Sequence, residues 1–351
     1  RRLQPGVNPE LEIGRYLTEV RRFPNTPPLA GAVEYEDPRS GTVSLALLQG
    51  FVPSQGDGWS YVLGYLDRYL ERRLLSASWS PEEEGPAEPP GQEGQEADEG
   101  FFMELMRTLG VRTGELHAAL AAPTDDPSFS PEPAPPAEVS RWVEAVLDDL
   151  RLTLSLLERR RSGLPEEVRP EVDRLLRMEA RAFDRLEAIS ARGIRAVKTR
   201  HHGDYHLGQV LVAGNDFQII DFEGEPARTL EERRRKHSPL RDVAGMLRSF
   251  DYAAQTALMN LGADRAVGED PEPVVRRWER SVREAFLGGY AEGVRGAGVL
   301  PGEGEEAAAL VELFALEKAL YEIRYELDNR PDWIGIPVRG VLDLLTREES
   351  P

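Results

Sequence analysis

Two neighbouring stretches decide the fold of this 351-residue chain. They read His201-His202-Gly203-Asp204-Tyr205-His206-Leu207-Gly208-Gln209-Val210-Leu211-Val212 and Phe217-Gln218-Ile219-Ile220-Asp221-Phe222-Glu223-Gly224. The apolar run that ends the first stretch is separated from the one that opens the second only by Ala213-Gly214-Asn215-Asp216. Because glycine and asparagine tolerate a positive φ, this pattern predicts two antiparallel strands joined by a tight turn, which we call the ribbon.

Acidic and amide side chains stand at both ends of the ribbon. Asp204 and Gln209 precede its first strand, and Asp221 and Glu223 follow its second strand. The two ends of an antiparallel hairpin lie side by side, so we expect these groups to meet at one rim. Asp204 could orient an attacking hydroxyl. Gln209 and Asp221, with Glu223 as a further ligand, could hold Mg²⁺, and these are parts that phosphoryl transfer needs.

The same loop permits a second interpretation. His202, Asp204 and His206 alternate along the chain, a spacing that could ligate a transition metal as in a metallohydrolase. That interpretation is weaker, because it leaves Gln209 and Asp221 without a role. We expect His202 to be a structural residue bonded to backbone near Asp221, and His206 to be a candidate for substrate contact.

Composition narrows the function further. A formal net charge of −19 argues against a nucleic-acid partner, because binding a phosphate backbone needs clustered cations. The absence of cysteine excludes disulfides and a cysteine nucleophile. No apolar run reaches membrane-spanning length and no signal peptide is visible, so we expect a cytoplasmic protein with no membrane partner.

The N-terminal part predicts one helix and a second hairpin. Asn8 and Pro9 are typical of a helix start, and the helix should run to about Arg22 with its apolar face buried. That face comprises Leu11, Tyr16, Leu17 and Val20. Residues 31–36 and 42–48 then alternate as strands do.

Two charged segments look unstructured or solvated. Residues 80–100 contain eight acidic and no basic residues, so we expect a disordered insert. Residues 231–236 are a charge run, which we expect to be the solvated face of a loop.

Six sequence segments, which follow one another in the same order as in a known family, carry a resemblance to that family. The segments are Gly6-Val7-Asn8-Pro9-Glu10-Leu11-Glu12, Gly56-Asp57-Gly58-Trp59, His202-Gly203-Asp204-Tyr205-His206-Leu207-Gly208-Gln209, Ile220-Asp221-Phe222-Glu223-Gly224-Glu225-Pro226, Ser238-Pro239-Leu240-Arg241-Asp242-Val243-Ala244-Gly245-Met246 and Tyr325-Glu326-Leu327-Asp328-Asn329-Arg330-Pro331-Asp332-Trp333. The chain resembles bacterial maltokinases, including the kinase domain fused to trehalose synthases. These belong to the protein-kinase-like group that contains aminoglycoside and choline kinases. The resemblance covers nearly the whole chain outside the acidic insert.

The resemblance implies an α+β, protein-kinase-like bilobal fold whose mostly helical C-terminal lobe contains the ribbon as a catalytic β-hairpin. Residues 1–52 would be the remainder of an N-terminal β-containing lobe and the hinge, and residues 53–351 the C-terminal lobe. The phosphate-positioning lysine of such kinases should lie just before Arg1, so we expect the N-terminal lobe to be truncated and ATP binding to be weak without the upstream segment. Glu12 would be that lysine's ion-pair partner.

The activity implied is transfer of the ATP γ-phosphate to the anomeric hydroxyl of maltose, giving maltose 1-phosphate for trehalose and α-glucan (glycogen) metabolism. Asp204 would be the catalytic base, and Gln209 and Asp221 would bind magnesium. The nucleotide-binding hinge would comprise Gln49, Gly50, Phe51 and Val52, whose backbone meets adenine.

The helix around residues 318–325 resembles the family's sugar-binding helix. Lys318, Tyr321 and Tyr325 should share one face, a cation and two rings that suit a disaccharide. The same three residues could instead be a helix-packing stripe. Arg330 and Trp333 look like a structural clasp at a helix end.

Two other functions remain open. An aminoglycoside or choline kinase would take a cationic acceptor and need an acidic pocket, whereas Lys318 and Tyr321 favour a neutral polyol. A non-catalytic kinase-like module fused to, or associated with, a trehalose synthase would have no use for both Asp204 and Asp221.

Overall fold

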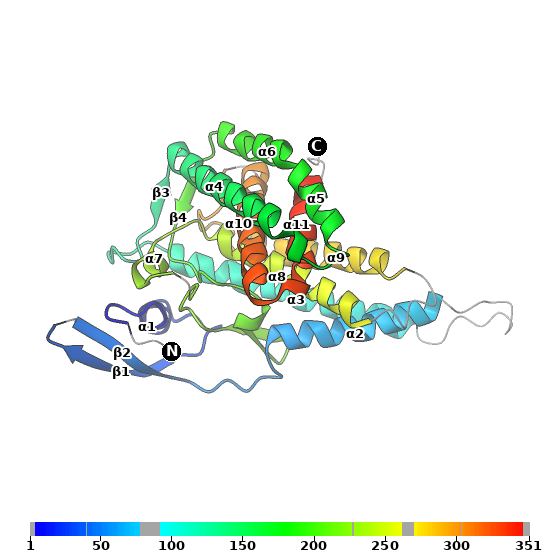
Figure 1. The fold of residues 1–351 in the computed structure, drawn as a ribbon. Helices are drawn as coiled ribbons and strands as arrows, with labels where there is room; N and C mark the ends of the chain where they lie inside the picture. The colour runs from blue at the N-terminus through cyan, green and yellow to red at the C-terminus, as the bar shows by residue number, and fades with distance from the viewer. Residues whose placement is uncertain are drawn as a thin grey trace. The chain divides into compact units, whose positions relative to one another are not determined.

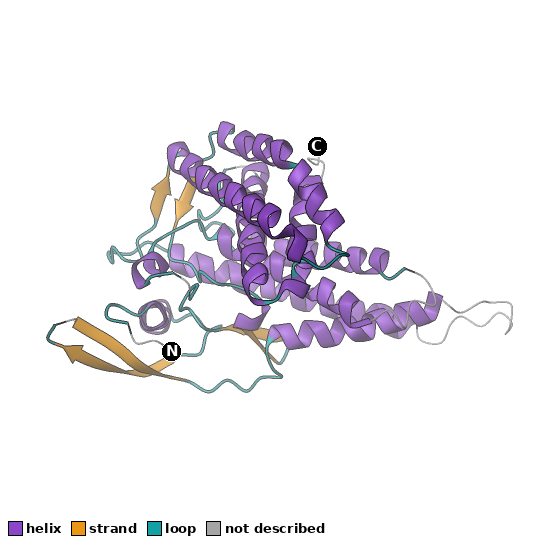
Figure 2. Ribbon diagram, viewed as in Figure 1, coloured by secondary structure: helices purple, strands orange, loops and turns teal. Residues whose placement is uncertain are grey.

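The computed structural model of the chain describes residues 4–39, 41–77, 92–226, 228–261, 270–302 and 304–346. They form two compact units, and Figure 2 shows that helices dominate. Unit 1 comprises Arg1–Ala122, His202–Arg235 and Ser249–Ala297, and unit 2 comprises Pro123–His201, Lys236–Arg248 and Gly298–Pro351. This division follows packing. The lobe boundary expected between residues 52 and 53 stays a prediction.

Unit 1 opens with the predicted helix (Figure 1). α1 (Pro9–Arg15) begins after Asn8, whose Oδ1 accepts a hydrogen bond from the Leu11 backbone N–H at 3.1 Å. The chain then widens into a π-helix, η1 (Tyr16–Arg21), and turns at Arg22, which has a φ of 52°. The helix therefore begins and ends where the sequence indicated.

One residue of this helix faces differently from the prediction. Leu11, Tyr16 and Leu17 are buried as expected, but Val20 is 57% exposed. The π-helical winding uses i→i+5 hydrogen bonds, so the 3.6-residue periodicity no longer holds there. Val20 accordingly leaves the apolar face.

The second hairpin is also present. β1 (Leu29–Asp37) pairs antiparallel with β2 (Gly41–Gln49), so the predicted strands at 31–36 and 42–48 are confirmed and longer. The Gly50 backbone N–H donates to the Pro28 carbonyl oxygen at 2.8 Å, which ties the exit of β2 to the approach of β1.

Four helices complete most of unit 1, and they are α2 (Gly58–Ala77), α3 (Gln92–Ala121), α7 (Leu230–Arg234) and α9 (Glu272–Gly293). α3 and α9 pack very closely because glycines lie at their contact. A Cβ atom at Gly110 would overlap the Phe286 carbonyl oxygen, and one at Gly289 would overlap the Arg107 carbonyl oxygen. Glycine is thus required on both helices.

Part of the segment that we predicted to be disordered is helical. Residues 80–91 lie outside the described residues, but residues 92–100 form the first turns of α3 rather than a disordered segment. Two ion pairs to α2 neutralise two acids of this segment: Arg72 pairs with Asp98 and Arg73 with Glu99, each at 2.6 Å. Partners on another helix thus compensate a composition that looked unable to order itself.

The ribbon has the predicted geometry. β5 (Val210–Ala213) pairs antiparallel with β6 (Asp216–Ile219) in a register that matches Val210 with Ile219. Gly214 has a φ of 67°, which permits the two-residue turn. The alternate residues Val210, Val212, Phe217 and Ile219 are buried.

Unit 2 is mainly helical. Its strands are β3 (Glu132–Ala134) and β4 (Ala196–Lys198), an antiparallel pair, and its helices are α4 (Pro136–Arg160), α5 (Arg169–Arg177), α6 (Glu179–Ala191), α10 (Gly304–Asn329) and α11 (Gly335–Thr346), with short 3-10 turns η2 (Arg161–Gly163) and η5 (Pro331–Trp333). Residues of α8 (Leu240–Leu261) belong to both units. Over the described part of the chain, none of the helices is long and apolar enough to cross a membrane.

Candidate active site

The two ends of the ribbon meet as predicted. Gln209, in the 3-10 turn η3 (Leu207–Gln209) before β5, donates from Nε2 to Oδ2 of Asp221 at 3.2 Å. The Ile220 backbone N–H also donates to the Gln209 carbonyl oxygen at 3.0 Å. An amide and a carboxylate twelve residues apart in sequence are therefore in contact at one rim.

Both edges of the ribbon are held by neighbouring segments of unit 1. Along β6, Thr26 donates from Oγ1 to the Ile219 carbonyl oxygen at 2.9 Å, and Asn25 donates from Nδ2 to that of Phe217 at 2.9 Å. Along β5, the Gln55 backbone N–H donates to the Val212 carbonyl oxygen at 2.8 Å. These bonds limit how far the rim can shift.

His202 joins the two halves of the rim. Its Nε2 lies 2.8 Å from the Ile220 carbonyl oxygen and must donate, while Nδ1 accepts from the Asp204 backbone N–H at 3.4 Å. The predicted structural role of His202 is confirmed. Both of its ring nitrogens therefore make local contacts with backbone groups.

Asp221 has strained backbone. Its φ is 65°, in the left-handed region, which costs on the order of 1 kcal/mol for a residue with a side chain. The next residue, Phe222, is 2% exposed and packs its ring 5.0 Å from that of His202. The buried ring of Phe222 therefore anchors the chain directly after Asp221, and strain of this kind gathers at functional sites.

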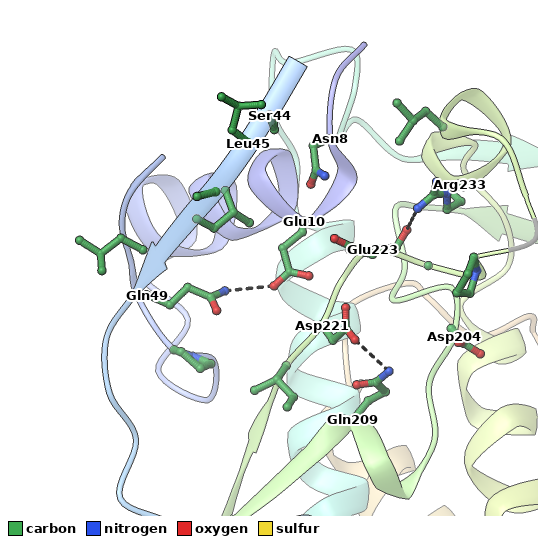
Figure 3. A pocket seen from close by; sticks show the side chains of 18 of the residues that line it. Asn8, Glu10, Ser44, Leu45, Gln49, Asp204, Gln209, Asp221, Glu223 and Arg233 are labelled. Carbon is green, nitrogen blue, oxygen red and sulfur yellow. Dashed lines mark hydrogen bonds between the residues drawn. The ribbon is translucent and has the colours of Figure 1, made fainter. Parts of the chain in front are cut away.

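A cavity of about 1350 Å³ lies in unit 1 beside this rim. Asp204, Gln209, Asp221 and Glu223 line it, and Figure 3 shows these side chains around one space. Residues 49–52, the predicted hinge, line the same cavity. Its volume exceeds the roughly 300–1,000 Å³ usual for small-molecule pockets, so a nucleotide would fit.

The hinge residues differ in their hydrogen bonds and in their exposure. Gln49 donates from Nε2 to Oε1 of Glu10 at 3.1 Å, and the backbone N–H of Gly50 is bonded to Pro28. Phe51 is 91% exposed, an unusual state for a phenylalanine. The contact of this segment with adenine stays a prediction.

Glu10 is a cavity residue that sequence reasoning missed. It is only 6% exposed, and burial, followed by the negative charge of Asp221, raises its pKa to about 7. Glu12, the acid we predicted at this place, lies on α1 but is held by Arg234, with Nε–Oε2 at 2.9 Å and Nη2–Oε1 at 2.7 Å. A signal for Glu10 existed, because its i+3, i+4 and i+7 neighbours are apolar or glycine.

The charge run at 231–236 is only partly a solvated face: Glu231, Glu232 and Arg235 are exposed, whereas Arg233, Arg234 and Lys236 are half-buried and have partners. Arg233 lines the cavity, and Arg234 is the partner of Glu12. Within unit 2, Lys236 donates to the Pro127 carbonyl oxygen at 2.6 Å and to Glu132 at 2.7 Å. The prediction was wrong for Arg233, Arg234 and Lys236, because their side-chain partners are about 100 or more residues away in sequence.

His206 has a local structural bond. Its Nδ1 accepts a hydrogen bond from the Gly208 backbone N–H at 3.0 Å, which caps η3. The ring is half-buried and next to the loop that carries Asp204. Contact of His206 with a substrate stays a prediction.

The predicted sugar-binding residues lie on α10 in unit 2. They do share a face: Lys318 Nζ lies 5.1 Å from the Tyr321 ring centroid, and the rings of Tyr321 and Tyr325 stack at 6.3 Å. Arg330 lies over Tyr325 at 5.6 Å and over Trp333 at 5.0 Å, so the predicted clasp is present. Sugar binding by this face stays a prediction.

The donor set at the rim is of the kind that Mg²⁺ prefers. Among the residues that the structure describes, no group of three or more His, Cys, Asp or Glu side chains is arranged to hold a metal ion. His202 and His206 each use a ring nitrogen in a local hydrogen bond. Magnesium is usually held by one or two carboxylates, with substrate phosphates and water completing its shell. Asp221, Glu223 and the side-chain oxygen of Gln209 are such donors.

The fold is a known one, the kinase-like fold of glucosamine kinases. A glucosamine kinase solved in complex with glucosamine, ADP and inorganic phosphate superimposes with a TM-score of 0.71 at 22% identity, over 98% of this chain and 70% of that chain. A glucosamine kinase structure described as crystal form B gives a TM-score of 0.69 at 21% identity, over 99% of this chain and 72% of that chain.

Two curated relatives have the same description. The glucosamine kinase of Streptacidiphilus jiangxiensis is 25% identical over 237 residues, which are 68% of this chain and 48% of the relative. That of Mycolicibacterium smegmatis is 28% identical over 251 residues, 71% of this chain and 55% of the relative. The chain thus spans about half the length of these relatives. No protein-family model matches it.

These similarities bear on the expected partners. They show a kinase-like fold, but lend no support to maltose as acceptor, to a trehalose synthase partner, or to a role in trehalose or glycogen metabolism.

Proposed function

We propose that this protein transfers the γ-phosphoryl group of ATP to a hydroxyl of an amino sugar of the glucosamine type. The observation that carries the proposal is that Asp204, Gln209, Asp221 and the hinge segment 49–52 all line one cavity. The names of the relatives support the acceptor class. The net charge of −19 also favours an acceptor that bears an ammonium group over an anionic one.

Asp204 is the base in this mechanism. The sugar hydroxyl oxygen forms a bond to the γ-phosphorus, the bond from that phosphorus to the β–γ bridging oxygen breaks, and ADP leaves. The hydroxyl proton passes to the Asp204 carboxylate. His202 fixes the loop that carries Asp204, because its Nδ1 accepts the Asp204 backbone N–H.

Asp221, Gln209 and Glu223 would hold Mg²⁺. When bound, the ion neutralises negative charge on the phosphate groups. The strained backbone of Asp221 directs this group to the rim, where Gln209 already contacts it.

Glu10 takes the role that the sequence gave to Glu12. A buried acid beside Asp221 is the natural partner for a cation that positions phosphate, and Glu12 is already neutralised by Arg234. Gln49 holds the Glu10 carboxylate in place and is itself the last residue of β2, so the helix and hinge are linked.

An acceptor panel tests the proposal. ADP release by the full-length gene product would be measured with glucosamine, glucose and maltose, with products identified by mass spectrometry. We expect glucosamine-dependent ADP release and a product heavier by one phosphoryl group. A protein that binds ATP but phosphorylates none of these sugars would refute the proposed reaction, and a clear preference for maltose would refute the acceptor class.

A further inference from the structure

The segment after the ribbon folds back over the site. Gly224 follows Glu223 with a φ of 71° and is buried, and the Arg233 side chain packs against it. A Cβ at position 224 would lie 3.4 Å from the Arg233 Cγ atom. Glycine at this position therefore lets the arginine lie directly beside the backbone that leads from Asp221.

The Arg233 guanidinium is positioned by neutral oxygens. It donates from Nη1 to the Glu223 carbonyl oxygen at 3.3 Å, from Nε to the Arg228 carbonyl oxygen at 3.1 Å, and from Nη2 to the Gln4 side chain at 2.7 Å. A guanidinium has five N–H donors, so two remain after these bonds. Within the described ranges, no carboxylate pairs with Arg233.

The charges around the cavity are unbalanced. Glu10, Asp204, Asp221 and Glu223 line it, and a polyphosphate entering among four acids needs cationic contacts. Of the described lining residues, Arg228 and Arg233 are basic, and Arg228 is already paired with Glu225 at 2.6 Å. Arg233 is then the cation whose charge is still available to a ligand.

We propose that Arg233 binds the polyphosphate of the nucleotide. Its two remaining N–H groups donate to phosphate oxygens, and its bond to Glu223 places the charge two residues from Asp221. This inference rests on the proposed function, since it assigns the ligand as a nucleotide. It gives a function to part of the charge run at 231–236.

Binding measurements on the full-length protein test this assignment. Calorimetric titrations at fixed ionic strength in magnesium buffer would compare tripolyphosphate, ADP, adenosine and a hexosamine phosphate. The variants are Arg233→Gln, Arg233→Lys, and Arg235→Gln as the control. Arg235 lies next to the same short helix, its side chain is 67% exposed, and it pairs with Glu231.

We expect Arg233→Gln to weaken tripolyphosphate and ADP by about 10- to 100-fold, the loss of a charge-assisted contact, and to leave adenosine unchanged. Arg233→Lys should recover part of the affinity, and Arg235→Gln should match wild type. The lysine variant distinguishes charge from loop structure, because lysine cannot reproduce the three positioning bonds.

Four results would overturn the assignment. They are unchanged ADP and tripolyphosphate affinity in Arg233→Gln, an equal loss for adenosine, a loss confined to the hexosamine phosphate, and no binding of tripolyphosphate or ADP to wild type. Tripolyphosphate binding does not require sugar turnover. Failure of the acceptor panel with intact Arg233-dependent tripolyphosphate binding would therefore refute the kinase reaction alone.

Discussion

Replacing Glu10 by glutamine should stabilise the protein above neutral pH. Burial and the charge of Asp221 raise the Glu10 pKa from 4.5 to about 7 in the folded state. Between those values the folded state binds more protons at this site than the unfolded state, so stability falls as pH rises. This difference in pKa corresponds to at most about 3 kcal/mol of folding stability, and that stability is fully lost once the pH exceeds the folded-state pKa.

The Glu10→Gln variant resembles the protonated acid. Its amide can still accept the Gln49 hydrogen bond and adds a donor toward Asp221. The gain over wild type should therefore be about 3 kcal/mol at pH 8 and about 1 kcal/mol at pH 5. Glu12→Gln is the matched control, because it removes the partner of Arg234 and should not stabilise the protein at either pH.

Urea unfolding in EDTA buffer, followed by circular dichroism from pH 5 to pH 8, measures both effects. Metal must be absent, since a bound cation would lower the Glu10 pKa. If the wild type and Glu10→Gln differ by the same free energy at every pH, Glu10 does not titrate in this range and its assignment beside Asp221 is wrong.

Three further predictions concern the helix contact, the histidine and the metal. Gly289→Ala should destabilise the protein by about 1–3 kcal/mol, because its Cβ would overlap the Arg107 carbonyl oxygen. Gly288→Ala faces open space and should stabilise the protein by up to about 1 kcal/mol. Equal melting temperatures for the two variants would contradict the close packing of α3 and α9. His202→Ala should cost about 1–3 kcal/mol and lower kcat, since it removes the bonds to Ile220 and Asp204; a variant with wild-type stability and turnover would rule out its joining role. EDTA should abolish ATP turnover. Asp221→Asn should raise the Mg²⁺ concentration that gives half-maximal rate, whereas Asp216→Asn, at the far end of the ribbon, should not. If both variants have the same magnesium dependence as the wild type, Asp221 is not a metal ligand.

The parts of the site that the sequence predicted depend on local patterns. The alternation of apolar residues and the Gly214-Asn215 turn specify the ribbon and its register, and the register alone brings Gln209 to Asp221. His202 was predictable for the same reason, because the rim leaves backbone groups near Ile220 that need a partner.

The parts that it did not predict depend on partners distant in sequence. Glu10 and Glu12 are both acids on one helix, and only Arg234, more than two hundred residues later, decides which of them is neutralised. The folding of residues 92–100 depends likewise on ion pairs to α2. Composition and periodicity contain neither kind of information.

The close contact of α3 and α9 is a third example. Gly110 and Gly289 look like ordinary helix-weakening glycines in the sequence. Only the packed structure explains them, because each glycine faces the carbonyl oxygen of a residue on the other helix.

The most direct test of the central claim is the turnover number of Asp204→Asn at saturating ATP and glucosamine, with the ATP dissociation constant measured on the same protein. If Asp204 accepts the hydroxyl proton at the rim of the ribbon, kcat should fall by about 10²- to 10⁴-fold with nucleotide affinity unchanged. Wild-type turnover in Asp204→Asn would contradict the mechanism.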